Sequence, residues 1–173
     1  MRLSRTQGAS GVTYVSVPVV ISPDPAIAVT PIVNTVLNAL SATAKAGITR
    51  FVLNSSSKAA EKTVYNNSHT ITKNTFNHAE VAKAVNEPTV PTIEPALTVY
   101  SAGRTSAELA FWDWVKENKE KCPQLVANSV VSDGNFGRVL EPTKTGTGPV
   151  TSVGMLQREE RGKREGVMPF VDK

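Results

Sequence analysis

The sequence has very few of the residues on which disulfides and metal sites are built. One of its 173 residues is a cysteine, Cys122, and two are histidines, His69 and His78. A single cysteine excludes an intrachain disulfide and cysteine-based zinc motifs. The two histidines have no companion ligands near them in the sequence, so we expect surface residues rather than metal ligands. The scarcity of cysteine fits a reducing compartment, and we expect a cytoplasmic protein.

Long apolar runs and charge of one sign are also missing. The longest apolar-rich run, residues 12–21, is too short to span a bilayer, and the amino terminus lacks the apolar core of a signal peptide. The chain has 19 Lys and Arg against 15 Asp and Glu, a net charge of +4. Residues 157–166 mix both signs, which favours a solvated tail over a nucleic-acid or anion-binding patch. We therefore expect neither a membrane nor a nucleic acid as a partner.

Patterns typical of strands and helices alternate along the chain. The expected order is strand, helix, strand, long loop, helix, strand. This order predicts an α/β fold with a parallel sheet and helices on both of its faces. Gly47 is the expected terminator of the first helix. The long loop is of a kind that often forms a lid or binding loop, and it contains a short helix near residues 77–85. The elements in chain order cover residues 12–21, 27–46, 49–54, 57–97, 99–121 and 124–131.

Two groups of polar residues indicate a candidate site. Tyr100 and Arg104 lie four residues apart in the second helix and so share a face, where a fixed positive charge favours the ionised form of a phenol. Ser55, Ser56 and Ser57 follow the second strand, at the sheet edge where open α/β folds bind ligands. Together they are typical of proton-transfer chemistry. Taken alone, the serines fit better as hydroxyls that satisfy backbone groups at a strand end, and the pair fits better as part of a solvated helix face.

Several short stretches, in order along the chain, resemble the extended short-chain dehydrogenase/reductase family. The resemblance is to its fungal aldehyde and ketone reductases and to dihydroflavonol reductases, and it covers about residues 10–142. No single stretch is specific, but their order and spacing are. The stretches are Gly11-Val-Thr-Tyr-Val-Ser-Val-Pro18, Ser22-Pro-Asp-Pro25, Val33-Asn-Thr-Val-Leu-Asn-Ala-Leu40, Arg50-Phe-Val-Leu-Asn-Ser-Ser-Ser57, residues 100–118 and residues 135–142.

The resemblance implies an oxidoreductase that transfers a hydride between NADP or NAD and a small carbonyl substrate. Carried over by position, Ser56 holds the carbonyl oxygen and Tyr100 is the acid/base. Arg104 stands where the family has a lysine that binds the nicotinamide ribose. On the cofactor side the resemblance therefore implies Tyr100, Arg104 and Ser55, and it implies no metal.

The chain also departs from the family pattern. The glycine-rich turn that seats the pyrophosphate on a helix N-terminus is absent, because Gly8-Ala-Ser-Gly11 is too short and precedes the wrong strand. Tyr14 replaces a histidine, Ser132 a proline and Arg104 the lysine. The resemblance thus implies a partial Rossmann-like, doubly wound parallel sheet of about three strands. The N-terminal dinucleotide-binding half is lacking, and the chain is truncated at both ends relative to the family.

The predicted organisation leaves two functions open. We expect residues 1–142 to form the partial reductase domain and residues 143–173 a turn-rich tail. The first strand, without its usual neighbour, becomes an exposed edge that favours self-association. The chain is then either a carbonyl reductase with impaired activity or a catalytically inactive homologue, which acts as a binding or interaction protein or is the product of a decayed gene.

Overall fold

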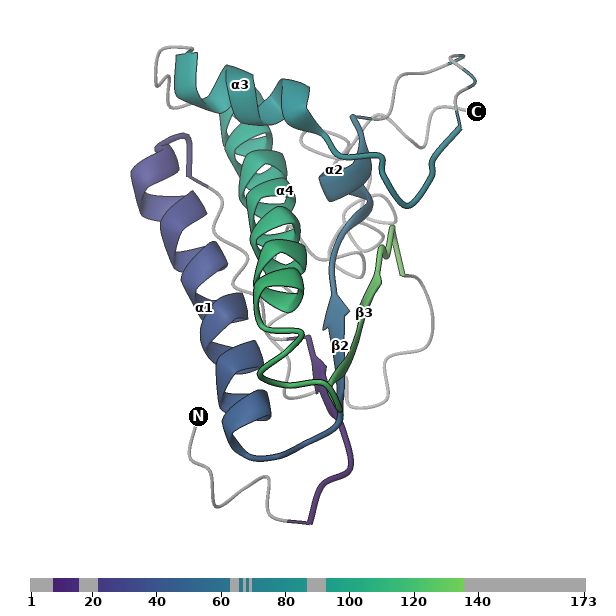
Figure 1. Ribbon diagram of the computed structural model, residues 1–173. Coiled ribbons are helices and arrows are strands. Elements are labelled where there is room, and N and C mark those ends of the chain that lie inside the picture. Colours follow the sequence, from purple (N-terminus) through teal and green to yellow (C-terminus); the bar gives the residue numbers. More distant parts are fainter. Residues whose placement is uncertain are drawn as a thin grey trace, which may run out of the picture. The chain divides into compact units, whose positions relative to one another are not determined.

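The computed structural model describes residues 8–15, 22–62, 66, 68, 70–86 and 93–135, and the structural statements below concern these residues. Residues 1–133 form one compact unit and residues 134–173 a second. The predicted tail, residues 143–173, lies outside the described residues. The elements of the first unit are β1 (Val12–Tyr14), α1 (Pro25–Lys45), β2 (Arg50–Asn54), α2 (Ser57–Ala60), α3 (His78–Asn86), α4 (Ile93–Glu117) and β3 (Val126–Val130) (Figure 1).

Three parallel strands form the sheet, in the order β1-β2-β3. Phe51 of β2 lies opposite Val12 of β1 and Ala127 of β3. This register confirms the predicted parallel sheet with the second strand at its centre. The strand expected over residues 12–21 is paired only within β1, and residues 16–21 lie outside the described part of the chain. β1 is an edge of the described sheet, and self-association through it stays a prediction.

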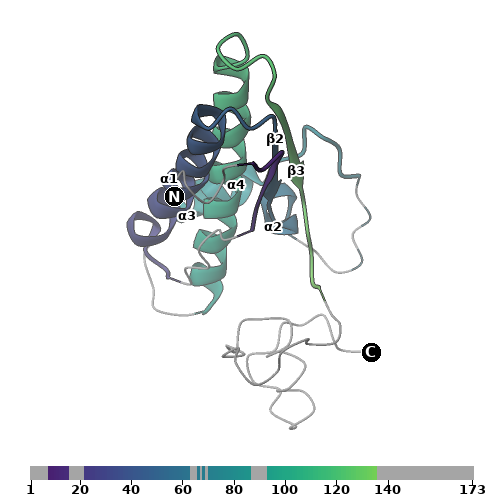
Figure 2. The same cartoon turned by 90° about the horizontal axis from the view of Figure 1, so that it is seen from below.

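Both long helices, α1 and α4, pack on the same face of the sheet (Figure 2). Each connects one strand to the next in the same direction across the sheet, and crossovers of one hand then place their helices on one side. On the opposite face of β3, Val126 and Val130 are 51% and 53% exposed. Helices were expected on both faces of the sheet, and in the described residues the two long helices cover one face.

Helix α1 begins and ends at residues whose chemistry favours a boundary. Asp24 is the N-cap, and its side chain accepts a hydrogen bond from the Ala26 N–H at 2.9 Å. Gly47 follows the helix with φ +69°, and its N–H donates to the Ala44 carbonyl at 3.0 Å. Only a residue without a side chain adopts this conformation at little cost, which confirms Gly47 as the terminator.

By length and composition alone, α1 would also be long and apolar enough to cross a membrane. The search for apolar runs in the sequence did not single it out. In the structure its Ile32, Val36 and Leu40 are fully buried against β2 and α4, as in the core helix of a folded domain.

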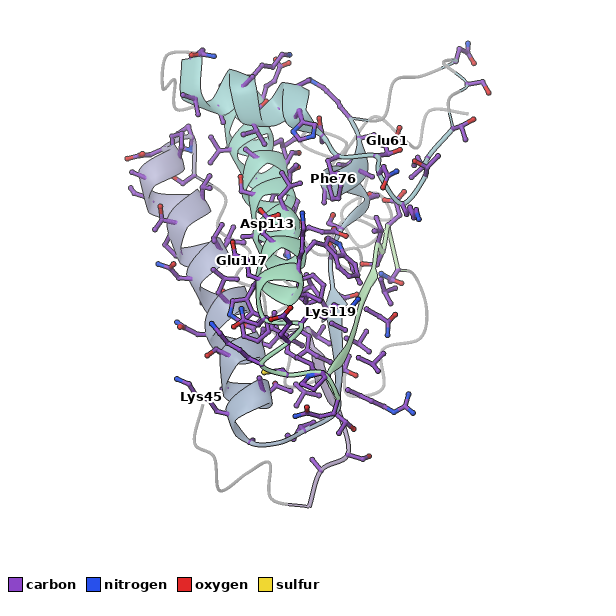
Figure 3. The ribbon with its side chains drawn as sticks, in the orientation of Figure 1. Lys45, Glu61, Phe76, Asp113, Glu117 and Lys119 are labelled. Atoms are coloured by element: carbon purple, nitrogen blue, oxygen red, sulfur yellow. The ribbon has the colours of Figure 1, made fainter. Side chains whose placement is uncertain are left out.

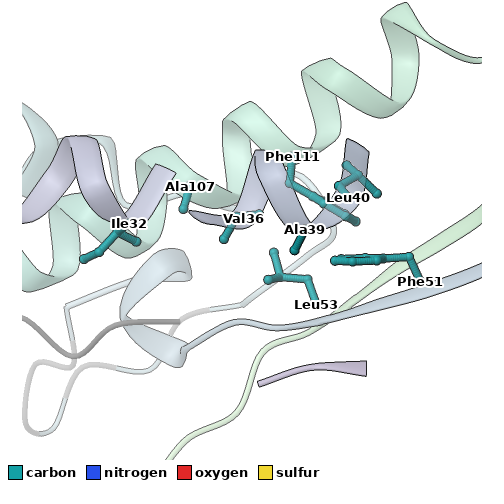
Figure 4. Close-up of a cluster of buried hydrophobic side chains, with 8 residues drawn as sticks. All are labelled: Ile32, Val36, Ala39, Leu40, Phe51, Leu53, Ala107 and Phe111. Carbon is teal, nitrogen blue, oxygen red and sulfur yellow. The ribbon is translucent and has the colours of Figure 1, made fainter. Parts of the chain in front are cut away.

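The core lies between α1, α4 and the helical face of the sheet (Figure 4). Phe51 and Phe111 are fully buried, with ring centroids 5.9 Å apart. Gly103 lies at the contact of the two helices, and a Cβ atom there would come within 2.9 Å of the Ile32 Cδ1 atom, so the tip of the Ile32 side chain would have to shift. The buried members of the cluster are Ile32, Val36, Ala39, Leu40, Phe51, Leu53, Ala107 and Phe111.

Helix α4 starts six residues before the predicted boundary at residue 99 and is covered on several sides. It packs against α1, α2 and α3 as well as against the sheet. Leu109 and Ala110 of this helix are half-buried, and Trp114 packs at the margin of the core. A helix with so many neighbours has no single apolar stripe, so its inner face cannot be read from periodicity. Its carboxyl-terminal end carries the exposed Asp113 and Glu117 (Figure 3).

The predicted long loop contains two helices, α2 and α3, of which only α3 was expected. Asn77 joins them with three hydrogen bonds. Its backbone N–H donates to the Ala59 carbonyl at 2.9 Å and its Nδ2 to the Lys58 carbonyl at 3.1 Å, while its Oδ1 accepts the Glu80 N–H at 3.3 Å. This buried side chain both caps α3 and holds it to α2.

Replacing Asn77 by Ala is expected to lower the free energy of unfolding by about 1–3 kcal/mol, because the Lys58 carbonyl and the Glu80 N–H lose their partner. Asn74→Ala is the matched control, since Asn74 is exposed, and it should stay within about 0.5 kcal/mol of the wild type. Urea denaturation measures both. Equal effects of the two substitutions would contradict this role for Asn77.

Candidate active site at the end of strand β2

Hydrogen bonds join the serines after β2 to the end of β3. The Ser55 N–H donates to the Val130 carbonyl at 2.9 Å, and the Ser57 N–H to the Ser132 carbonyl at 2.7 Å. The Ser132 hydroxyl donates back to the Ser55 carbonyl at 3.1 Å. The ladder of the sheet therefore continues past the last residue of β2. A proline at position 132, as in the family pattern, would lack this hydroxyl.

Ser55 is buried, and its hydroxyl is hydrogen-bonded to the carboxyl group of Glu108 in α4. The Ser55 hydroxyl donates to Oε2 of Glu108, and the Ser129 hydroxyl of β3 donates to Oε1 at 2.7 Å. Ser55 and Glu108 are 6% and 5% exposed. The carboxyl group thus connects both strands to the helix that carries Tyr100 and Arg104.

Ser56 and Ser57 make local contacts and are half-buried. Ser56 is the N-cap of α2, where its hydroxyl oxygen accepts the Lys58 N–H at 3.3 Å. Since it acts there as an acceptor, this hydroxyl keeps its own hydrogen for donation. Ser57 instead donates to Oδ1 of Asp133 at 3.1 Å. Of the three serines, Ser56 is thus the one best placed to donate to a ligand.

Tyr100 and Arg104 are in contact on α4. The guanidinium carbon of Arg104 lies 5.1 Å from the centroid of the Tyr100 ring, within the range of a cation–π interaction. Arg104 is 8% exposed, whereas Tyr100 is half-buried. The buried Nε of Arg104 has no hydrogen-bond partner among the described residues. The charge therefore lies against the face of the phenol ring.

Helix α2 places Ser56 beside the tyrosine helix. It packs against α4, where the Thr105 hydroxyl, next to Arg104, donates to the Ser101 carbonyl at 2.8 Å and lies 3.4 Å from the Ala59 carbonyl of α2. The segment that follows β2 is therefore packed against the helix that carries Tyr100, and a site shared by the serines and Tyr100 stays a prediction. Among the described residues, no hydrogen bond joins Ser56 to Tyr100.

Sequence reasoning missed Glu108 and gave Ser132 no structural role. A signal for Glu108 existed, since a carboxyl group four residues after Arg104 stands among apolar neighbours. Within the described residues, no group of three or more His, Cys, Asp or Glu side chains could hold a metal ion. His78 packs against Phe76 beside α2, with ring centroids 6.1 Å apart, and His69 lies outside the described residues.

Comparisons with known proteins find relatives that are named as an aldehyde reductase and as NAD-dependent epimerase/dehydratases. No protein-family model matches the chain. It is 34% identical over 151 residues to aldehyde reductase 2 of Sporidiobolus salmonicolor, a match that covers 82% of the chain and 41% of the relative. It is 31% identical over 140 residues to the NAD-dependent epimerase/dehydratase tndE of Aspergillus flavipes, covering 79% of the chain and 38% of the relative. The chain thus spans about two fifths of the length of the curated relatives it matches.

Solved structures with the same fold are also found. The Gre2 protein of Candida albicans aligns with a TM-score of 0.70 at 19% identity, covering 90% of the chain and 44% of the neighbour. The yeast methylglyoxal/isovaleraldehyde reductase Gre2, solved with NADPH, aligns with a TM-score of 0.60 at 18% identity, covering 80% and 40%. At this level of identity the likeness concerns the fold, and it supports a Rossmann-like arrangement.

Proposed function

This chain belongs to the extended short-chain dehydrogenase/reductase family, and from that premise we propose that the protein reduces a small aldehyde or ketone to an alcohol. NADPH, or NADH, supplies the hydride when bound. The names of an aldehyde reductase among the relatives and of an NADPH-bound reductase among the structural neighbours support this reaction.

One observation carries the proposal: two of the four candidate side chains are half-buried and the other two are buried. Ser56 and Tyr100 are half-buried, and the family resemblance gives these two residues to the carbonyl oxygen. Ser55 and Arg104 are 6% and 8% exposed; Ser55 directly precedes Ser56 in the chain, and Arg104 lies against the Tyr100 ring. In the proposed reaction the Ser56 hydroxyl donates a hydrogen bond to the carbonyl oxygen. Tyr100 gives that oxygen a proton as the carbon is reduced.

Of the three residues assigned to the cofactor side, Tyr100 agrees with a contact to a ligand, whereas Ser55 and Arg104 do not. Tyr100 is open enough to meet a ligand. The Ser55 hydroxyl is buried against Glu108, and the Arg104 guanidinium lies over the tyrosine ring, so neither fits a direct contact with a nucleotide in this arrangement. We propose instead that Arg104 orients the Tyr100 ring and contributes positive charge beneath it.

A fluorescence titration with NADPH tests the cofactor part of the proposal on the full chain. We expect saturable binding that persists in the Tyr100→Phe variant, because this substitution keeps the ring and removes only the hydroxyl. Absence of binding at millimolar NADPH would contradict reductase function for this chain.

The contact between Arg104 and Tyr100 also favours a second candidate function, a homologue that has lost catalysis and acts by binding a partner. A guanidinium is larger than an ammonium group and planar, and here it is nine-tenths buried, so it does not replace the family lysine atom for atom. Titration of Arg104→Lys separates the two candidates. Tighter NADPH binding and faster aldehyde reduction would identify the cation as the defect. No binding by either protein would favour the inactive homologue.

A further inference from the structure

We propose that Glu108 is a positioning residue. It holds the segment that follows β2, which contains Ser56, at a fixed position relative to helix α4, which carries Tyr100. This inference rests on the proposed function, because the geometry it maintains is that of Ser56 relative to Tyr100. Glu108 itself is 5% exposed, and each carboxyl oxygen accepts a serine hydroxyl, so it is not placed to touch a substrate.

The two donors to Glu108 come from different strands. Ser55 stands at the end of β2, directly before Ser56, and Ser129 lies in β3 opposite Leu53. A buried carboxyl group is costly unless it is hydrogen-bonded, and a purely apolar side chain would fill the same place without that cost. The Glu108 carboxyl group therefore sets the orientation of the two serine side chains, because both hydroxyls have to face α4 to donate to it.

Helix geometry transmits this constraint to the site. Arg104 lies four residues before Glu108 and Tyr100 eight residues before it, so the three side chains lie near one face of α4 within about two turns. A fixed distance between Glu108 and Ser55 thus fixes the separation of Ser56 from Tyr100. Misplacement of a reacting group by about 1 Å can lower a rate by about 10²-fold.

Three further hydrogen bonds depend on the same alignment. These are the Ser55 N–H to Val130 carbonyl, the Ser57 N–H to Ser132 carbonyl and the Ser132 hydroxyl to Ser55 carbonyl contacts. They leave the Ser55 and Ser57 amides as local reporters of the junction. Loss of the Glu108 contact should loosen this junction before it loosens the rest of the sheet.

Amide hydrogen exchange in the full chain tests the inference without requiring activity. In Glu108→Ala, the Ser55 and Ser57 amides should exchange about tenfold faster or more, while amides in the middle of α1 change by less than about threefold. Glu108→Gln should stay within about threefold of the wild type at both places, since its carbonyl oxygen accepts one hydroxyl and its NH₂ group donates to the other serine. Uniformly faster exchange, or unchanged exchange at Ser55 and Ser57, would overturn the proposal.

Kinetics of aldehyde reduction give the second readout. Glu108→Ala is expected to lower kcat about tenfold or more with a smaller change in KM, and Glu108→Gln to restore most of it. Phe111→Leu is the control, because it reduces core packing of the same helix and changes none of the atoms in the two serine–Glu108 hydrogen bonds. An equal loss of kcat in the control would overturn the positioning role. If the wild type shows no turnover, the proposed function fails while the exchange experiment still decides the role of Glu108.

Discussion

Replacement of Tyr100 by Phe is expected to lower kcat for carbonyl reduction by about 10²- to 10⁴-fold, the usual effect of removing a positioned acid/base group. The variant keeps the aromatic ring over which the Arg104 guanidinium lies, so the cation–π contact should persist. The substitution therefore removes the proton donor with little change in packing. Steady-state kinetics with NADPH and an aldehyde measure this effect.

Tyr14→Phe is the matched control for this variant. Tyr14 lies in β1, where its ring stacks on Phe51 with centroids 6.3 Å apart, and the ring remains after the substitution. We expect its kcat to remain within about twofold of the wild type, because residues outside the reacting groups contribute little to the proton transfer. A loss in Tyr14→Phe as large as that in Tyr100→Phe would contradict the assignment of the acid/base.

Replacement of Phe111 by Ala is expected to lower the free energy of unfolding by about 3–5 kcal/mol. Phe111 is fully buried in the core cluster, and its ring contacts both Phe51 and Trp112, with centroid distances of 5.9 and 4.8 Å. Domains of this size are stable by about 5–15 kcal/mol in total, so the loss is a large fraction of the stability. Guanidinium denaturation followed by circular dichroism measures it.

Trp112→Ala provides the comparison for Phe111→Ala. Trp112 is the adjacent aromatic residue and is 36% exposed, so its removal leaves less of a buried cavity. The expected loss is about 1–2 kcal/mol. A Trp112 effect larger than that of Phe111 would show that the core does not lie between α1, α4 and the sheet as described.

Local chemistry made several elements predictable from the sequence. Gly47 marks the end of α1 because a left-handed conformation favours glycine, whereas the N-cap at Asp24 and the start of the helix at Pro25 were not predicted. A strand was predicted over residues 49–54, and the structure has β2 there, at the centre of the described sheet. The parallel arrangement followed from the alternation of strands and helices.

Long-range packing explains what could not be predicted. The burial of Arg104 and Glu108 depends on α1, α2 and the sheet closing around α4, which no local pattern records. The role of Ser132 depends on a carbonyl 77 residues earlier in the chain, that of Ser55. Tyr100 and Ser56 were found because the family order pointed to them. Their catalytic roles, that of Arg104 and the cofactor-side role of Ser55 stay predictions until the variants are measured.

The proposed reaction is tested most directly by measuring whether the 173-residue chain forms an alcohol from NADPH and an aldehyde such as isovaleraldehyde. We expect one alcohol to form for each NADPH consumed, at a rate that falls to background in the Tyr100→Phe variant. Absence of alcohol from the folded wild-type chain at saturating NADPH and aldehyde would contradict it.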